Sequence, residues 1–583
     1  MKFLFFFLCI TLFVSCSKTV DNPDNIDFTT TFEKSNGTQT PTYDEVIQFY
    51  KDLDDAYVSI KTYEVGTTDI GEPLTLISFN PNRSFESEFA ESQDVRRVLI
   101  NNGIHPGESD GIDATMMLMR DLAQGKIEAP ENTWVGAIAI YNVGGALNRN
   151  STSRTNQNGP EAYGFRGNAK NYDLNRDFIK NDTKNSQAFT EIFHLVRPDV
   201  FIDNHVSNGA DYQYTLTHLF TQHNKLGGVL GDYLYQDFQP KLELDLKSKD
   251  WDITPYVNVF NRTPEQGFSQ FMDHPRYSTG YTALWNTIGL MVETHMLKPY
   301  KPRVEGTYEL MKSALKITAQ EGEKIKALRK DAFNAFAKAD TYPLAHTIDS
   351  TQTSTLQFLG YEGEMIPSEI TGQQRLKYNR NKPFTKEITY YNFFKPSKEV
   401  SIPKAYVIPR GWRDIVLKLR ENEISFKQLK KDTTFMAEVY HIEDYQTSRN
   451  PYEGHYPHYG TTVTATQEEV TIRKGGYIVK TEDQDGLRYL LETLEPEAND
   501  SFFNWNFFDT ILQQKEGFSP YVWEDKALEF LNQNPAIKAE FEAKKIAEAA
   551  FAQNWYAQLS WIHKKSPQYE KAHLRYPIVR MLR

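Results

Sequence analysis

Two short polar motifs, each at the end of an apolar run, could bind a metal ion together. His105 and Glu108 follow the apolar segment 97–101, and His205 follows another. An imidazole and a carboxylate three residues apart can face one ion on a single bend, and a catalytic zinc normally takes three protein ligands and a water. Open α/β sheets bind ligands at the carboxyl ends of their strands. The three residues therefore predict a zinc site, with Asp203 placed to orient a neighbouring group.

The segments around these motifs alternate between strand and helix patterns. The strands are expected at 59–66, 72–79, 97–101, 134–141, 200–203 and 289–293, and the helices at 43–55, 110–125 and 186–196. Such alternation favours an α/β fold with a mixed, mostly parallel sheet flanked by helices. The stretch 306–338 predicts one helix to about residue 330 and a second after it, which would close this domain.

The rest of the chain predicts a second domain. At 583 residues the chain exceeds what one hydrophobic core supports. Pro343 interrupts the helical pattern, so we expect domains at 41–340 and 350–583. The strand-like segments 354–361, 386–391, 405–409 and 437–442, with a helix at 413–421, favour a C-terminal α/β or α+β domain with a helical end.

The first residues have the features of an export signal. A short basic start precedes an apolar run at 3–14, which is too short to span a bilayer as a helix. The sequence FVSC, which ends at Cys16, resembles a bacterial lipobox, in which the cysteine becomes the lipidated first residue. We therefore expect a signal peptide at 1–15 and a polar tether at 16–40. Simple cleavage near Ser15 is the alternative.

The cysteine count bears on disulfide bonds, and the net charge bears on nucleic-acid binding. Cys9 and Cys16 are the only cysteines, so one would remain after cleavage before Cys16 and no intrachain disulfide could form. The net charge is −12 and no basic stripe stands out, so we expect no nucleic-acid partner. Contact with a membrane is expected only through the lipid anchor, in the periplasm or at the outer membrane of a Gram-negative bacterium.

Four motifs resemble a known family when they are taken in chain order. HPGE, NYDLNRDF, FIDNH and GLMVETH look like the zinc carboxypeptidase, carboxypeptidase A-like, family, over about residues 43–328. Gly66 and Gly71 match a further family segment. The resemblance implies that His105, Glu108 and His205 bind one zinc ion, that Asn175 and Arg176 hold the substrate's terminal carboxylate, and that Glu293 is the general base.

Two further roles implied by the resemblance have competing candidates. An arginine between the first two motifs would stabilise the oxyanion, and Arg154 is slightly favoured over Arg149. A mobile tyrosine would cover the substrate, and Tyr277 competes for this role with Tyr281. His295 lies two residues after the base, where it either neighbours Glu293 or packs in the core.

The resulting prediction is an exported, zinc-dependent metallocarboxypeptidase. Its substrate would be a peptide with a free C-terminal carboxylate. One alternative is a zinc amidase acting on cell-wall peptides or N-acyl amino acids, and another is a catalytically inactive binding lipoprotein of the cell envelope. His455 and His458 could suggest a second metal site, but their Pro-containing segment is more typical of an aromatic loop.

Overall fold

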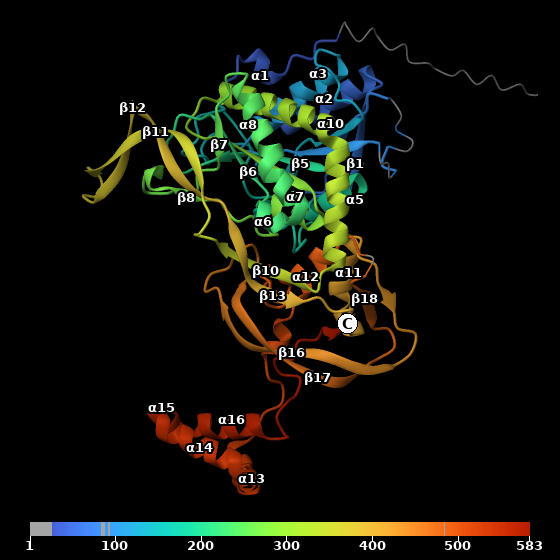
Figure 1. The fold of residues 1–583 in the computed structure, drawn as a ribbon, viewed down its shortest axis with the longest axis vertical. Helices are drawn as coiled ribbons and strands as arrows, with labels where there is room; N and C mark the ends of the chain where they lie inside the picture. Colours follow the sequence, from blue (N-terminus) through green and yellow to red (C-terminus); the bar gives the residue numbers. More distant parts are fainter. Residues whose placement is uncertain (1–25, 83–84, 86–87, 91–93, 483, 583) are drawn as a thin grey trace, which may run out of the picture.

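The computed structural model describes residues 26–82, 85, 88–90, 94–482 and 484–582 (Figure 1). The expected signal peptide and the cysteine expected to carry lipid lie outside the described residues. Within them, no helix is both long and apolar enough to cross a bilayer.

An eight-stranded mixed sheet forms the centre of the N-terminal domain. Its order is β1-β2-β4-β3-β5-β9-β6-β7. The strands β3, β4, β5 and β9 are joined by parallel pairs, as are β6 and β7, whereas β1–β2, β2–β4 and β6–β9 are antiparallel. The predicted α/β fold with a mixed, mostly parallel sheet is confirmed. The bounds are β1 (Ile60–Val65), β2 (Leu74–Phe79), β3 (Arg96–Asn101), β4 (Thr133–Ile138), β5 (Val200–Ser207), β6 (Leu216–Phe220), β7 (Ile253–Pro255) and β9 (Ile288–His295).

Helices cover both faces of this sheet because its strands are apolar on both sides. Val98 and Ile100 pack on one face with α2 (Tyr43–Ala56), α3 (Asp110–Ala123) and α10 (Tyr300–Lys338). Leu99 and Phe201 pack on the other face with α5 (Lys184–Val196) and with the C-terminal domain. Shorter helices complete the domain: α4 (Val143–Leu147), α6 (His223–Leu226), α7 (Gly228–Tyr233), α8 (Gln239–Lys247) and α9 (Ser278–Thr282).

Two segments differ from the sequence-based expectation. The stretch 300–338 is one continuous helix, α10, and not two. The expected tether ends earlier than residue 40, because Phe28 and Phe32 are buried in the core beside α2 and α3. Between them begins α1 (Thr31–Lys34), which is capped by Thr30. The segment has a polar composition, but its two phenylalanine side chains pack into the core and hold it against the domain.

A long hairpin arm follows α10. The strands β11 (Ser354–Pro367) and β12 (Gln374–Tyr391) pair with each other, and β12 also pairs with β8 (Phe268–Ser269) of the N-terminal domain. Phe358 and Ile388 of the arm join a small core with residues of the N-terminal domain. The arm therefore packs partly on the first domain, although its sequence lies in the expected second one. The strands β10 (Thr341–Ile348) and β13 (Phe394–Ser401) pair alongside.

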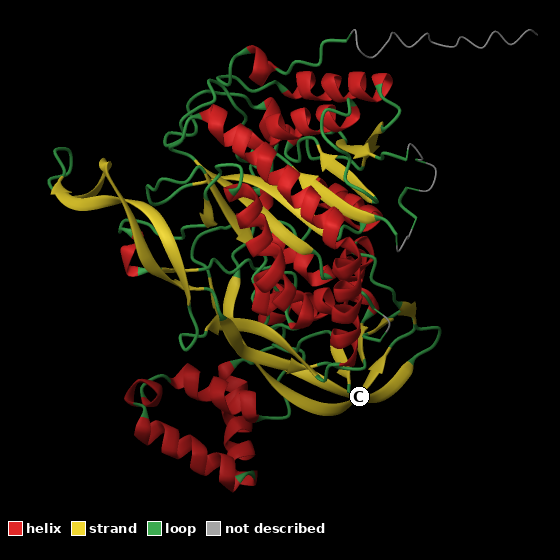
Figure 2. Ribbon diagram, turned by 45° about the horizontal axis from the view of Figure 1, so that its top comes forward, coloured by secondary structure: helices red, strands yellow, loops and turns green. Residues whose placement is uncertain are grey.

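The C-terminal domain contains a six-stranded sheet with the order β15-β18-β14-β19-β16-β17. Its elements are β14 (Ala405–Ile408), α11 (Arg413–Glu421), β15 (Lys427–Gln428), β16 (Thr433–Thr447), β17 (His458–Ile472), β18 (Tyr477–Lys480), α12 (Leu487–Leu494) and β19 (Val579–Met581). The remaining helices, α13 (Pro520–Gln533), α14 (Pro535–Ala547), α15 (Ala549–Ala552) and α16 (Trp555–Lys565), have a core of their own and project beyond the sheet (Figures 1 and 2).

Arg488 on α12 ties the two domains together. It is buried and donates to Ala283 O over 2.8 Å, to Asn286 Oδ1 over 3.1 Å and to Lys225 O over 2.7 Å. Removal of the guanidinium would leave these buried acceptors without their donor, which is costly in a low-dielectric interior.

We predict that Arg488→Ala lowers the free energy of unfolding by about 3 kcal/mol. Urea denaturation followed by tryptophan fluorescence measures this change. Arg420→Ala, which alters an exposed arginine on the neighbouring α11, is the control and should stay within about 0.5 kcal/mol of the wild type. Equal denaturation midpoints for wild type and Arg488→Ala would contradict the role of this contact.

Candidate metal centre and active site

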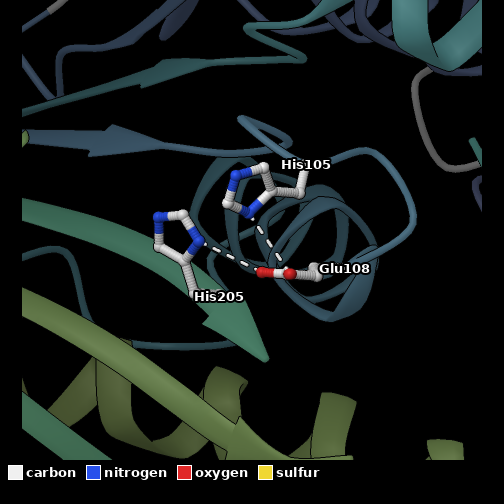
Figure 3. Close-up of side chains that lie close together, drawn as sticks. All are labelled: His105, Glu108 and His205. Carbon is white, nitrogen blue, oxygen red and sulfur yellow. Dashed lines mark hydrogen bonds and ion pairs between the residues drawn. The ribbon is translucent and has the colours of Figure 1, made fainter. Parts of the chain in front are cut away.

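His105, Glu108 and His205 form a compact buried cluster at the carboxyl ends of β3 and β5 (Figure 3). Their potential ligand atoms all lie within 4.8 Å of one another. Glu108 Oε1 is 3.2 Å from His105 Nδ1, and Glu108 Oε2 is 3.1 Å from His205 Nδ1. Both rings thus turn the same nitrogen toward one carboxylate, which is the arrangement of an N₂O donor set around one ion.

A carboxylate holds the far nitrogen of each ring. His105 Nε2 donates to Asp173 Oδ1 over 2.9 Å, and His205 Nε2 donates to Asp203 Oδ2 over 2.9 Å. Carboxylate–histidine pairs of this kind fix the tautomer and leave the other nitrogen free to bind a metal. The orienting role expected for Asp203 is thus seen at His205. Asp173 was missed, although it stands two residues before Asn175 in the same motif.

The electrostatics of the cluster suit a bound cation. Although burial alone would lower it, the carboxylates of Asp203 and Glu108 raise the pKa of His205 well above its usual range. Burial would raise the pKa of Glu108, but His105 and Arg154 hold it well below normal. His105 Nδ1 is buried and makes no well-aligned hydrogen bond to the described residues, although Glu108 Oε1 lies 3.2 Å away. A divalent ion that accepts two imidazole nitrogens and a carboxylate, such as zinc, fits these groups.

The structure separates the two arginines considered for the oxyanion. Arg154 lines the cavity at the cluster and donates to Glu108 Oε1 over 2.8 Å. Arg149 instead donates to the backbone oxygens of residues 40 and 41. A third arginine, Arg166, also lines the cavity, 3.5 Å from Glu108 Oε1, and it pairs with Asp173. No pattern in the sequence marked Arg166, because its contact with Glu108 joins residues 58 positions apart.

Asn175 and Arg176 lie on the same cavity, which has a volume of about 630 Å³. The Arg176 guanidinium stacks 4.6 Å from the ring centre of Tyr277, and Asn175 Oδ1 accepts the N–H of Ser278 over 3.2 Å. Tyr277 lines the cavity, whereas Tyr281 is buried and donates to an asparagine of the C-terminal domain. Of the two tyrosines, only Tyr277 is therefore positioned to contact a substrate.

Glu293 lies beside His205, since the two residues are paired in the parallel β5–β9 ladder. Burial raises the pKa of Glu293 to about 8, an effect that His205 opposes and Glu108 reinforces. Such a carboxylate is a stronger base than one in water. His295 does not join the site. It is buried, and its ring donates to Ala210 O and accepts the N–H of the backbone at residue 297.

The cavity extends from Glu293 toward the start of β9. Met291, two residues before Glu293, lies on the same face of the strand, and Leu219 is its paired neighbour on β6. At the next position on this face, Gly289 leaves room for Thr279, whose Cβ lies 3.0 Å from the Cβ that another residue would carry there. Asp273 lines the cavity near this end and is almost fully buried. Met291 and Leu219 thus give this part of the wall an apolar surface, to which Asp273 adds a carboxylate.

His455 and His458 belong to no group of three potential metal ligands among the described residues. His455 Nε2 lies 2.7 Å from Asp182 Oδ2, and His458 Nε2 lies 3.0 Å from Asp509 Oδ1. Each ring also packs against phenylalanine rings. The interpretation as an aromatic loop agrees with these contacts.

Comparison with known proteins gives one sequence relative of near-full length. The chain is 22% identical over 504 residues to Carboxypeptidase 2 of Trichophyton rubrum, which covers 80% of this chain and 84% of that protein. No protein-family model matches. Two solved structures are distant likenesses. A metallo-carboxypeptidase from Burkholderia cenocepacia is 16% identical with a TM-score of 0.35, over 50% of this chain and 70% of that one. Carboxypeptidase A from Helicoverpa armigera is 13% identical with a TM-score of 0.38, over 52% and 77%.

We predict that Asp173→Ala weakens zinc binding about 10- to 100-fold, because His105 loses the carboxylate that orients it. Competition with a chromophoric chelator measures the affinity without any substrate. Asp55→Ala, which changes an exposed carboxylate on α2, is the control and should bind zinc as the wild type does. An unchanged affinity in Asp173→Ala would show that Asp173 does not support a metal ligand.

Proposed function

We propose that the protein is a zinc-dependent metallocarboxypeptidase that hydrolyses the C-terminal peptide bond of peptides. The observation that carries this proposal is one cavity that holds the His105–Glu108–His205 cluster, a base and a carboxylate-binding arginine together. The sequence similarity to Carboxypeptidase 2 along most of the chain supports a peptidase. The complete set of ligands and base favours an active enzyme over an inactive binding protein.

The bound metal ion and Glu293 would have different roles in the hydrolysis. A bound zinc ion would lower the pKa of its water to about 7 and polarise the scissile carbonyl. The Glu293 carboxylate accepts a proton from the attacking water and then delivers it to the nitrogen of the leaving amine. Burial raises the pKa of Glu293 to about 8, and a bound zinc ion would favour the ionised carboxylate, which is the form that accepts the proton.

Arginines bind the two charged parts of the substrate. Arg176, with Asn175 beside it, holds the terminal carboxylate, since a planar guanidinium can bind both carboxylate oxygens. We assign the developing oxyanion to Arg154 rather than to Arg166. Its side chain is 18% exposed, against 44% for Arg166, and a charge shielded from water acts more strongly.

Export belongs to the same proposal. The apolar run at 3–14 and the motif that ends at Cys16 support a secreted protein held at the membrane by a lipid, in the envelope of a Gram-negative bacterium. Peptides in that compartment include fragments of the cell wall. Muropeptides assayed beside ordinary peptides, with products identified by mass spectrometry, distinguish a carboxypeptidase from a cell-wall amidase.

We predict that Glu293→Gln lowers kcat about 10²- to 10⁴-fold and leaves one zinc bound per chain, because the amide cannot accept the proton. Hydrolysis of a blocked dipeptide and metal analysis of the same preparation provide both measurements. Glu305→Gln, at an exposed position on α10, is the matched control and should retain wild-type turnover. Turnover of Glu293→Gln within twofold of the wild type would exclude Glu293 as the base.

We predict that Arg176→Ala raises KM about 10- to 100-fold for peptides with a free C-terminus, since an ionic hydrogen bond contributes about 1.5–3 kcal/mol. The wild type should release the last residue from a peptide with a free C-terminus and should not cleave the same peptide when its C-terminus is amidated. Arg413→Ala, an exposed change on α11, is the control. Equal cleavage of the free and amidated peptides would contradict an exopeptidase.

A further inference from the structure

A loop of the C-terminal domain lies directly against the segment that carries Asp173 and Arg176. This loop, residues 448–457, joins β16 to β17. The N–H of Asp173 donates to Glu453 Oε2 over 2.8 Å, across 280 residues of sequence. The contact reaches the metal cluster in two steps, because the same aspartate holds His105 through its side chain.

Two neighbours of Glu453 also contact the segment 172–182. Gly454 approaches the Tyr172 hydroxyl so closely that a Cβ at this position would lie 2.7 Å from it. His455 Nε2 lies 2.7 Å from Asp182 Oδ2, and Asp182 in turn pairs with the fully buried Lys180. Three consecutive residues of the loop thus contact three points of the segment, which leaves the segment little freedom to move relative to the C-terminal domain.

The 448–457 loop is itself held in one shape. Tyr452 stacks on Trp505, with ring centres 6.1 Å apart and planes 17° from parallel, and Trp505 is almost fully buried. The backbone of Tyr452 and His455 exchanges two hydrogen bonds. Glu453 between them has a φ of 49°, in the left-handed region that a side chain other than glycine rarely occupies. Unfavoured conformations of this kind persist where the surroundings enforce them, often beside functional sites.

The C-terminal domain also holds the other side of the carboxylate-binding region. Asp500 Oδ2 accepts the N–H of Arg276 over 2.9 Å, and its Oδ1 lies 3.1 Å from Nε of the same arginine. Arg276 directly precedes Tyr277, which stacks on Arg176. Both chain segments that flank Arg176 therefore depend on contacts from the second domain.

We propose that Glu453 is a positioning residue of the metal centre, so that the C-terminal domain completes the active site of the first domain. Glu453 fixes the backbone of Asp173, and the Asp173 carboxylate then aims His105 Nδ1 at the ion. The catalytic consequence rests on the proposed function, whereas the consequence for zinc affinity does not.

The test compares three full-length variants by zinc competition with a chromophoric chelator and by peptide hydrolysis. Glu453→Ala removes the acceptor, and we expect zinc affinity and kcat each to fall about tenfold. Glu453→Gln keeps an acceptor oxygen for the Asp173 N–H, so we expect both values within about twofold of the wild type. Glu443→Ala changes an exposed glutamate on β16 and should behave as the wild type does.

Two outcomes overturn the proposal. One is a zinc affinity of Glu453→Ala within twofold of the wild type, and the other is a loss in Glu453→Gln as large as in Glu453→Ala. Should Glu453→Ala fail to fold, Gly454→Ala gives a second test, because Gly454 has a φ of 78°, which strains a residue with a side chain, and the added methyl group would crowd Tyr172. It should weaken zinc binding about tenfold in a folded protein, and unchanged binding would also overturn the proposal.

The same data separate this proposal from the proposed function. If the wild type binds zinc but hydrolyses no peptide, the proposed function fails, while the order of zinc affinities still decides the role of Glu453. If the wild type is an active carboxypeptidase and all variants bind zinc equally, only the role of Glu453 fails.

Discussion

The convergence of three carboxylates on two imidazole rings is the constraint on which the rest of the site depends. Glu108 lies between His105 and His205, and Asp173 and Asp203 lie behind them. Buried negative charge at this density is stable only beside positive charge, which protonated rings, arginines or a metal ion can supply. Arg154 neutralises part of it at Glu108. A divalent cation bound to the two Nδ1 atoms would neutralise the remaining negative charge, and both imidazole rings could then stay uncharged.

The sheet explains why these groups meet. β3, β5 and β9 are parallel neighbours, so the turn with His105 and Glu108, the end of β5 with His205, and Glu293 on β9 arrive at one edge. Glu293 and His205 are register partners, and their separation is therefore set by the ladder itself. Helices on both faces keep this edge fixed, because the strands bury apolar side chains on each side.

Local patterns in the sequence were sufficient for the groups that follow strands. The α/β fold and the proximity of His105, Glu108 and His205 could be predicted because apolar runs that end in a polar residue mark strand ends, whereas the role of Glu293 came from the family resemblance. The uninterrupted helix α10 was not predicted because Ala332 is its only buried residue after Ile325, which leaves little apolar periodicity in its last turns. Phe28 and Phe32 were hidden in a polar segment, and their burial depends on the surfaces of α2 and α3.

Contacts between distant segments were beyond prediction for a different reason. Arg166 lines the cavity because of where its loop crosses the site, which no periodicity records. Asp173 belongs to a recognised motif, but its partner His105 lies 68 residues earlier. A single sequence contains no signal that links such pairs.

The contact between Glu453 and Asp173 has a consequence for the order of events during biosynthesis. It joins residues 280 positions apart, so a growing chain holds the first domain long before it holds the loop. If the loop completes the metal centre, a ribosome-bound or truncated chain would bear an immature site with low affinity for zinc. Peptidase activity would then mature only when nearly the whole polypeptide has been made and folded.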